Sequence, residues 1–205
     1  YSSYGRDYLR YYNKHVKRRG FTKSDSVVDL HKKSQIEAKK RYEIVKNYFS
    51  KKKVLEIGSS TGAFLQLIDN CDSYGCEYSD ENREFSKQFI SGKAYHSIDQ
   101  IIGEKFDIIC MFHVFEHIKD PLIFLDKCKK ILKPNGLIII EVPHSEDPLI
   151  KLYNNKQYKD FVFQPMHPMI YNKQSLDFVF NSKGFLSVSV NYYQRYGLDN
   201  HLSWI

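Results

Sequence analysis

The stretch Val54-Leu-Glu-Ile-Gly-Ser-Ser-Thr-Gly62 constrains the fold of this chain more than any other. Val54 to Ile57 is an apolar run typical of a buried strand, and a turn of small residues, 58–62, follows at once. Residues 63–68 then have the apolar spacing of a helix. A strand, a glycine turn and a helix in this order bring backbone N–H groups against a nucleotide-like ligand. The stretch therefore predicts a binding site at the end of a strand.

Two acidic residues accompany this turn. Glu56 stands two positions before Gly58, and Glu77 follows Gly58 at the end of the next expected strand. Ser60 occupies the place of the middle glycine of a dinucleotide-binding turn, so the spacing is not G-x-G-x-x-G. The pattern resembles motif I and the ribose-binding acid of class I S-adenosylmethionine-dependent methyltransferases, which usually have another glycine near position 60.

The resemblance implies S-adenosylmethionine as the cofactor. The glycine turn would face the methionine part, Glu56 would support the turn or the amino group of the ligand, and Glu77 would hold the ribose. A βα turn without any ligand is the alternative. Ligands bind at the carboxyl ends of the strands in such folds, and the residues expected at the cofactor are Glu56, Gly58, Ser59, Ser60, Gly62, Glu77, Tyr78, Ile98, Asp99 and Phe112.

Length and composition fit one globular domain. With 205 residues and 42% hydrophobic content, the chain can bury a full core. No apolar run approaches the ~18 residues of a membrane span, and the first residues contain no apolar signal-peptide region. The four cysteines form no Cys-x-x-Cys pair, so we expect reduced, mostly buried thiols in a cytoplasmic protein.

Positive charge is concentrated near the N-terminus. Residues 1–53 contain sixteen Lys and Arg against five Asp and Glu, whereas the remaining residues are net negative. Aromatic residues lie among these charges, a combination that suits an anionic substrate, a nucleic acid or a membrane surface. Solvated helix faces over a buried aromatic stripe are the plainer explanation.

Strands and helices alternate along most of the chain. Two helices, 4–18 and 26–50, come first, and we expect residues 1–50 to form a helical lid on the same domain as residues 51–205. We expect strands at 54–57, 73–77, 95–98, 106–112, 137–142 and 185–193, and helices at 61–70, 80–91, 120–132 and 173–182. Repeated βα units predict an α/β fold with a doubly wound, mainly parallel sheet.

The order of elements from Val54 to Tyr193 resembles the class I methyltransferase fold. Residues 106–142 resemble the subgroup that contains quinone-biosynthesis O-methyltransferases and bacterial glycan methyltransferases. This subgroup implies methylation of a hydroxyl on a small acceptor, anionic or sugar-linked, in surface-glycan (capsule or lipopolysaccharide) biosynthesis. One departure is clear, because the family closes its sheet with a seventh strand and residues 194–205 do not obviously supply it.

Two histidines, His113 and His144, follow the fourth and fifth expected strands. A hydroxyl acceptor needs a base near neutral pH, and histidine suits that role. His113 is the first candidate and His144 the second. The alternative for each is a polar residue that only shapes the pocket.

A metal site is a second hypothesis for the same region. His113, Glu116 and His117 have the spacing of one face of a helical turn, and His167 could supply a fourth ligand. The turn resembles the metal site of small-RNA 3′-end methyltransferases, with His113 in place of their first Glu. Three His and one Glu favour a transition metal over magnesium. An RNA 3′-end 2′-O-methyltransferase and a non-catalytic cofactor-binding relative are therefore the alternative functions, and anchoring of the loop is the alternative for the cluster.

Overall fold

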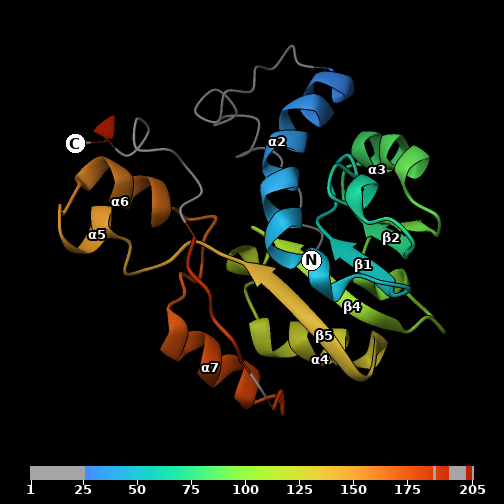
Figure 1. The fold of residues 1–205 in the computed structure, drawn as a ribbon. Helices are drawn as coiled ribbons and strands as arrows, with labels where there is room; N and C mark the ends of the chain where they lie inside the picture. Colours follow the sequence, from blue (N-terminus) through green and yellow to red (C-terminus); the bar gives the residue numbers. More distant parts are fainter. Residues whose placement is uncertain (1–25, 187, 194–201, 205) are drawn as a thin grey trace. The chain divides into compact units, whose positions relative to one another are not determined.

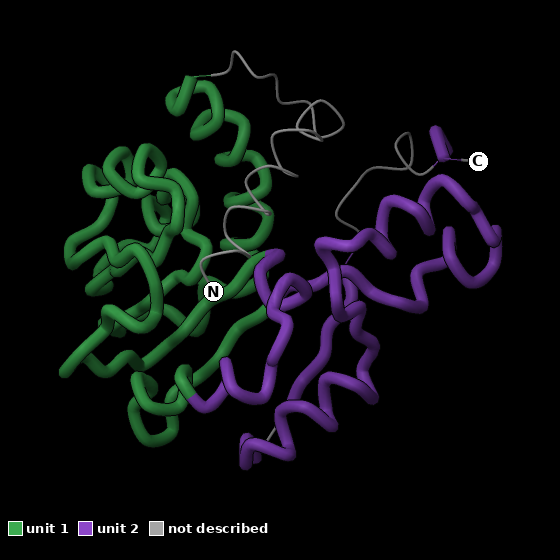
Figure 2. The backbone as a smooth tube through the Cα atoms, turned by 180° about the vertical axis from the view of Figure 1, so that it is seen from behind, with its two compact units in different colours: residues 1–112, 127–140 green, residues 113–126, 141–205 purple. Residues whose placement is uncertain are grey.

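The computed structural model describes residues 26–186, 188–193 and 202–204. The chain divides into two compact units, which Figure 2 draws in two colours. Unit 1 contains residues 1–112 and 127–140, and unit 2 contains residues 113–126 and 141–205. The helix predicted at 4–18 lies outside the described residues.

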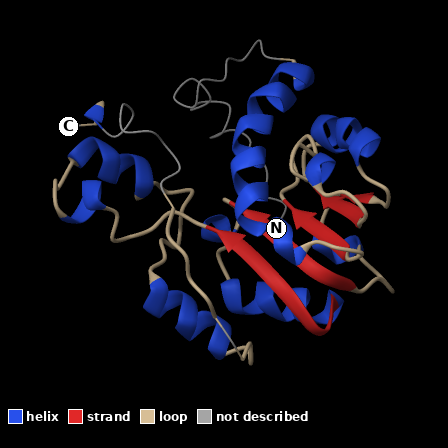
Figure 3. Cartoon of the chain, viewed as in Figure 1, coloured by secondary structure: helices blue, strands red, loops and turns tan. Residues whose placement is uncertain are grey.

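A five-stranded sheet with the order β3-β2-β1-β4-β5 forms the centre of unit 1 (Figures 1 and 3). β1 pairs in parallel with β2 and with β4, and β2 pairs in parallel with β3. The fold class predicted from the sequence is therefore confirmed. The strands are β1 Lys53–Ile57, β2 Asp72–Cys76, β3 Ala94–Tyr95, β4 Phe106–Phe112 and β5 Leu132–Glu141.

Six α-helices lie within the described residues, and short 3-10 turns connect several elements. The helices are α2 Val27–Val45, α3 Asp80–Ser86, α4 Pro121–Ile131, α5 Pro148–Lys151, α6 Lys156–Val162 and α7 Lys173–Asn181. The 3-10 turns are η2 Lys46–Tyr48, η3 Leu65–Leu67, η4 Lys87–Phe89, η5 Ile98–Gln100 and η6 Phe115–His117. None of the helices in the described part of the chain is both long and apolar enough to cross a membrane.

α2 is joined to the sheet by a shared core. It starts with a capping box, in which the Ser26 hydroxyl accepts from the Asp29 N–H and the Asp29 carboxylate accepts from the Ser26 N–H. Ala38 on α2 then packs in one buried cluster with Val54 of β1 and Ile108 of β4. α2 thus belongs to the core that also contains Ala63, the residue after the glycine turn.

The helix predicted at 61–70 is wrong. Within the range the structure has only the 3-10 turn Leu65–Leu67, which has no side-chain cap. Ala63, Phe64, Leu65 and Ile68 are all buried. These apolar residues are therefore buried because the whole segment lies in the core, and not because they form the buried face of a regular helix.

Several predicted boundaries also need correction. The predicted strand 95–98 is only Ala94–Tyr95, because Ile98 begins a 3-10 turn, and the predicted helix 80–91 divides into α3 and η4. β5 starts at Leu132, and not at residue 137. Within β5, Asn135 has a φ of 59°, and a Cβ on Gly136 would lie 2.6 Å from Leu132 Cγ.

Unit 2 has an aromatic core of its own. The Phe115 ring packs against Phe124, Tyr171 and Phe180 at centroid distances of 6.5, 5.2 and 5.6 Å. The sequence did not predict α5 and α6. The sixth strand predicted at 185–193 is wrong for the described residues of that range, which form no strand and include a fully exposed Leu186.

Candidate functional site

The turn after β1 is held in an unusual backbone conformation. Gly58, Ser60 and Gly62 have φ values of 75°, 47° and 80°, in the region that favours glycine. Ser60 is not a glycine, but it takes up a glycine-like conformation. The Gly58 N–H donates to the Cys76 carbonyl at 2.7 Å, so the turn is tied to the end of β2.

Glu77 clamps this turn from the end of β2. One carboxylate oxygen accepts from the Ser60 N–H at 2.9 Å, and the other accepts from the Ser79 N–H at 2.7 Å. Burial raises the pKa of the Glu77 carboxyl, and these backbone N–H groups oppose the rise. Each carboxylate oxygen still has a lone pair for a further donor.

Glu56 is a buried carboxyl with an unused oxygen. It is 5% exposed, and its Oε2 has no hydrogen-bond partner among the described residues. Burial raises the pKa of Glu56 to about 8, with the charge of Arg41 opposing and that of Glu77 adding to the rise. Buried polar atoms normally have a partner, so Oε2 marks a place where a ligand donor fits.

The sequence did not predict Arg41, which lies on α2 and faces the same end of the sheet. Its guanidinium carbon is 5.2 Å from the ring centroid of Phe112, the last residue of β4. Its charge acts on Glu56, as the pKa of that carboxyl shows. Arg41 follows Ala38 and precedes Val45, both buried, and this helical spacing could have placed it on the buried face of α2.

His31 was also not predicted, and it fixes α2 to the glycine turn. Its Nδ1 lies 3.0 Å from Thr61 Oγ1, and its Nε2 lies 3.0 Å from Gln66 Oε1. The ring stacks on Phe89 at 4.3 Å between centroids. The position of Arg41 therefore depends on contacts that α2 makes with the turn itself.

The remaining predicted cofactor residues lie after β2, β3 and β4. Tyr78 is partly exposed and packs on His96, with 4.5 Å between ring centroids. Ile98 is buried, whereas Asp99 is exposed and forms an ion pair with Lys127 at 2.6 Å. The structure thus places Ser60 in a hydrogen bond with Glu77, and Glu56 close enough for the charge of Glu77 to act on it. Asp99 instead forms its ion pair with Lys127.

In unit 2, His113 is held between two carboxylates. Its Nδ1 lies 3.1 Å from Glu116 Oε1, and its Nε2 lies 2.6 Å from Glu141 Oε1. Its φ of 56° and a hydrogen bond from its N–H to the Glu141 carbonyl fix the backbone. Both ring nitrogens of His113 therefore face carboxylate oxygens of unit 2.

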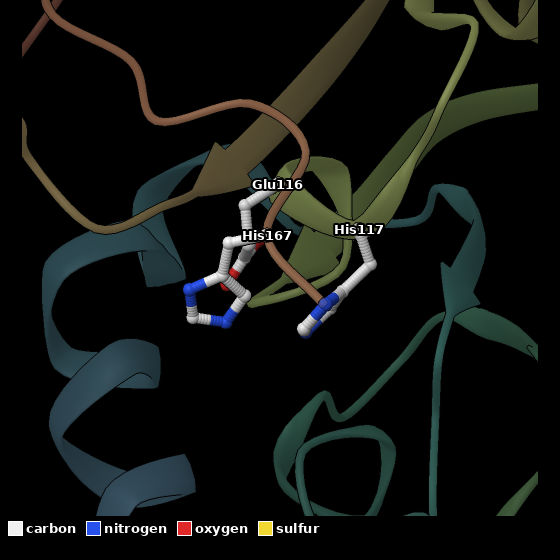
Figure 4. Close-up of side chains that lie close together, drawn as sticks. All are labelled: Glu116, His117 and His167. Carbon is white, nitrogen blue, oxygen red and sulfur yellow. The ribbon is translucent and has the colours of Figure 1, made fainter. Parts of the chain in front are cut away.

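Glu116 is 1% exposed and is the carboxylate at the centre of a wider cluster. Burial alone would raise the pKa of Glu116, but the hydrogen bond and charge of His113 outweigh it and hold the pKa below its usual value. Figure 4 shows Glu116 beside His117 and His167, with ligand atoms of the three residues within 4.8 Å of one another. His113, which was also a predicted ligand, is hydrogen-bonded to Glu116 and is not part of this group of three.

His144 is placed differently from the other histidines of unit 2. Its backbone forms a bridge with Tyr171, and its ring meets the edge of Tyr192 at 4.8 Å between centroids. Its Nε2 is buried and has no hydrogen-bond partner within the described ranges. A carboxylate oxygen of Glu146 lies 3.9 Å from this nitrogen. His144 therefore has a ring nitrogen to which the described residues provide no hydrogen bond.

The known sequences to which this chain is similar are those of methyltransferases. A family model described as a methyltransferase domain matches residues 31–190. Ubiquinone biosynthesis O-methyltransferase from Haemophilus ducreyi is 27% identical over 104 residues, which cover 43% of this chain and 44% of that enzyme. For the curated relatives compared, the matched part spans 15% to 44% of the relative's own length.

Solved structures show the same architecture. A SAM-dependent methyltransferase from Archaeoglobus fulgidus has a TM-score of 0.64 and 22% identity, over 78% of this chain and 73% of that chain. The plantazolicin methyltransferase BpumL, solved in complex with SAH, has a TM-score of 0.54 and 15% identity, over 85% of this chain and 69% of that chain. At these identities the likeness is one of fold.

Proposed function

This chain belongs to the methyltransferase domain family, and from that premise we propose that it transfers a methyl group from S-adenosylmethionine to a hydroxyl oxygen of a small acceptor. The observation that carries the proposal is the group of polar side chains around the glycine turn. Glu77 is fixed by two backbone N–H groups, and Glu56 keeps a buried oxygen without a donor. Both features fit a ligand that has hydroxyl and ammonium groups.

Different residues of unit 1 would contact the two ends of this cofactor. Glu77 would accept hydrogen bonds from the ribose hydroxyls. Glu56 would accept from the amino group, and Arg41 would pair with the carboxylate of the methionine part. When bound, S-adenosylmethionine supplies a methyl group on a positively charged sulfur, which is a good leaving group. The contribution of the chain is then mainly to position and desolvate the reactants.

We assign the base to His144 and not to His113. Both ring nitrogens of His113 face carboxylates, whereas Nε2 of His144 has no hydrogen-bond partner in the described part of the chain. In this role His144 Nε2 takes the hydroxyl proton as the acceptor oxygen forms its bond to the methyl carbon. His113 instead holds Glu116 in place.

The acceptor class rests on two lines of support. The curated relatives are named ubiquinone biosynthesis O-methyltransferases, which favours oxygen as the methylated atom. The basic residues 1–53, which include the exposed lysines Lys32, Lys33, Lys39 and Lys40 of α2, favour an acceptor with negative charge. We therefore propose a phosphorylated or nucleotide-linked sugar of bacterial surface-glycan biosynthesis.

A calorimetric experiment tests the cofactor site one end at a time. S-adenosylhomocysteine has both ends of the cofactor, whereas 5′-methylthioadenosine lacks the amino and carboxyl groups. We expect Glu77→Ala to weaken binding of both compounds, and Arg41→Ala to weaken only S-adenosylhomocysteine. Loss of one charge-assisted contact, about 1.5–3 kcal/mol, corresponds to roughly 10- to 100-fold in Kd.

Each variant is first checked for an unchanged far-ultraviolet circular dichroism spectrum, and Glu81→Gln, an exposed substitution on α3, serves as the matched control. Absence of S-adenosylhomocysteine binding by the folded wild-type chain would refute the proposal. Equal weakening of both compounds by Arg41→Ala would refute the assignment of Arg41 to the carboxylate.

The acceptor is then sought by release of S-adenosylhomocysteine with a panel of candidates. The panel contains phosphorylated sugars, nucleotide-linked sugars, polyphenols and short RNA. Turnover confined to sugars supports the proposed class. Turnover with RNA that falls steeply as salt rises would replace that class with an RNA substrate.

A further inference from the structure

Three side chains of unit 2 form a compact set of metal-ligand groups. Glu116 and His117 come from the turn η6, and His167 comes from the segment that follows α6. One ligand atom from each lies within 4.8 Å of the others, and Figure 4 shows the two rings and the carboxyl group side by side. Residues separated by about fifty positions in the sequence are therefore folded onto one spot.

Hydrogen bonds to backbone carbonyls orient both imidazole rings. His117 Nδ1 lies 2.7 Å from the Met166 carbonyl oxygen, and His167 Nδ1 lies 2.7 Å from the Val162 carbonyl oxygen. A carbonyl only accepts, so each Nδ1 carries a hydrogen, and in its neutral form each ring has its lone pair on Nε2. This tautomer, with a carbonyl behind the ring, is the one that metal-binding histidines adopt.

The contact between Gln164 and His167 agrees with this tautomer. The Gln164 side-chain amide nitrogen lies 3.1 Å from His167 Nε2, where it donates to the lone pair. A cation at the same lone pair would displace a flexible side-chain amide. It would not displace a backbone group or disturb the core.

Glu116 supplies the negative charge of the set. His113 engages its Oε1, whereas its Oε2 is buried and has no hydrogen-bond partner in the described residues. An unpartnered carboxylate oxygen in a side chain that is 1% exposed is costly. A carboxylate oxygen of Glu116 lies within 4.8 Å of ring nitrogens of His117 and His167, and one cation can bind all three atoms.

We propose that Glu116, His117 and His167 bind one divalent transition-metal ion, zinc in preference to magnesium, with His113 as the residue that orients Glu116. Two imidazoles and one carboxylate form a ligand set found at catalytic zinc, where a fourth position stays open for water or a substrate oxygen. Magnesium and calcium prefer oxygen ligands, so a set with two nitrogens disfavours them. The site does not depend on the proposed methyl transfer.

Metal binding by the full chain tests this inference directly. The chelator-stripped protein is titrated with Zn²⁺ in the calorimeter and with Co²⁺ by visible absorption, which reports nitrogen and oxygen coordination. We expect one ion per chain, and we expect His167→Gln to abolish saturable binding. His113→Gln should weaken binding by roughly 10- to 100-fold and leave the stoichiometry unchanged, because it removes only the orienting partner.

A control variant and an added probe complete the test. His96→Gln removes a histidine of unit 1 and should leave Zn²⁺ binding unchanged. Acetohydroxamate, a small oxygen chelator, should shift the Co²⁺ spectrum if a coordination position is open. If acetohydroxamate leaves the Co²⁺ spectrum unchanged, the inference of an open coordination position is wrong.

Two outcomes would overturn the site itself. They are no saturable Zn²⁺ binding by the wild-type chain, and binding that persists in a folded His167→Gln variant. Titration of S-adenosylhomocysteine into the same stripped samples keeps the two proposals separate. Zinc binding without S-adenosylhomocysteine binding would leave the metal site standing and remove the proposed function.

Discussion

Glu56 makes the stability of this chain depend on pH in a way that one substitution can isolate. Burial raises the pKa of Glu56 from 4.5 to about 8, so the folded chain binds this proton more tightly than the unfolded chain does. The stability that comes from the neutral carboxyl is complete below pH 4.5 and is lost as the pH rises toward 8. Glu56→Gln keeps the shape of the side chain and cannot ionise.

The expected size of the effect follows from the gap between the two pKa values. At ~1.4 kcal/mol per pKa unit, and with half-ionisation of each state at the two ends of the range, the difference in unfolding free energy between the Gln variant and wild type should grow by about 4 kcal/mol from pH 4.5 to pH 8. At pH 7 the unfolding free energy of the variant minus that of wild type should be about 3 kcal/mol larger than at pH 4.5. Above pH 8 the difference should stay level.

Urea unfolding at half-unit steps from pH 4.5 to pH 9 measures this difference. Other ionisable groups affect both proteins alike, so subtraction leaves Glu56. Glu81→Gln, the same substitution at an exposed position of α3, is the matched control. A difference that is constant over the whole range for Glu56→Gln would refute the argument that burial keeps this carboxyl neutral.

Three further changes probe the turn, the first helix and the base. Gly62→Ala forces a side chain into a φ of 80° and places its Cβ 3.1 Å from Ser86 Cβ; we expect a loss of about 1–2 kcal/mol in urea unfolding together with weaker S-adenosylhomocysteine binding. Ser26→Ala removes the cap of α2 and should cost about 1 kcal/mol in the same assay, with binding unchanged once the chain is folded. His144→Gln should lower kcat about 10²- to 10⁴-fold with S-adenosylhomocysteine affinity intact, and the lost activity should return in part at high pH; a kcat within tenfold of wild type would exclude His144 as the base.

The sequence predicts the sheet well where local chemistry and burial agree. The glycines at 58 and 62 fix a turn that few other residues allow, and the apolar run 106–112 is a strand buried on both faces. The fold class follows from such elements. The sequence did not predict the clamp from Glu77 to Ser60, because the resemblance implied Glu56 for support of the turn and Glu77 for the ribose.

Other features depend on contacts that a single sequence does not contain. The apolar residues of the segment 61–70 have helical spacing. They are buried in the core that α2 and β1 share, and the segment forms only a 3-10 turn. Leu186 continues a strand-like pattern, yet the segment has no neighbouring strand to pair with among the described residues. Arg41 looks like one more charge on a basic helix, and only the packing of α2 on the sheet brings it to Phe112.

The central position of β1 has a consequence for biosynthesis. Its pairing with β2 joins Val54 to Ser73, whereas its pairing with β4 joins Val54 to Ile108. Closing the second loop costs more chain entropy, and parallel pairings of this kind form slowly. As the chain leaves the ribosome, the apolar strand Lys53–Ile57 therefore keeps one edge open until β4 has emerged. Newly made protein is most exposed to aggregation and chaperone capture during that interval.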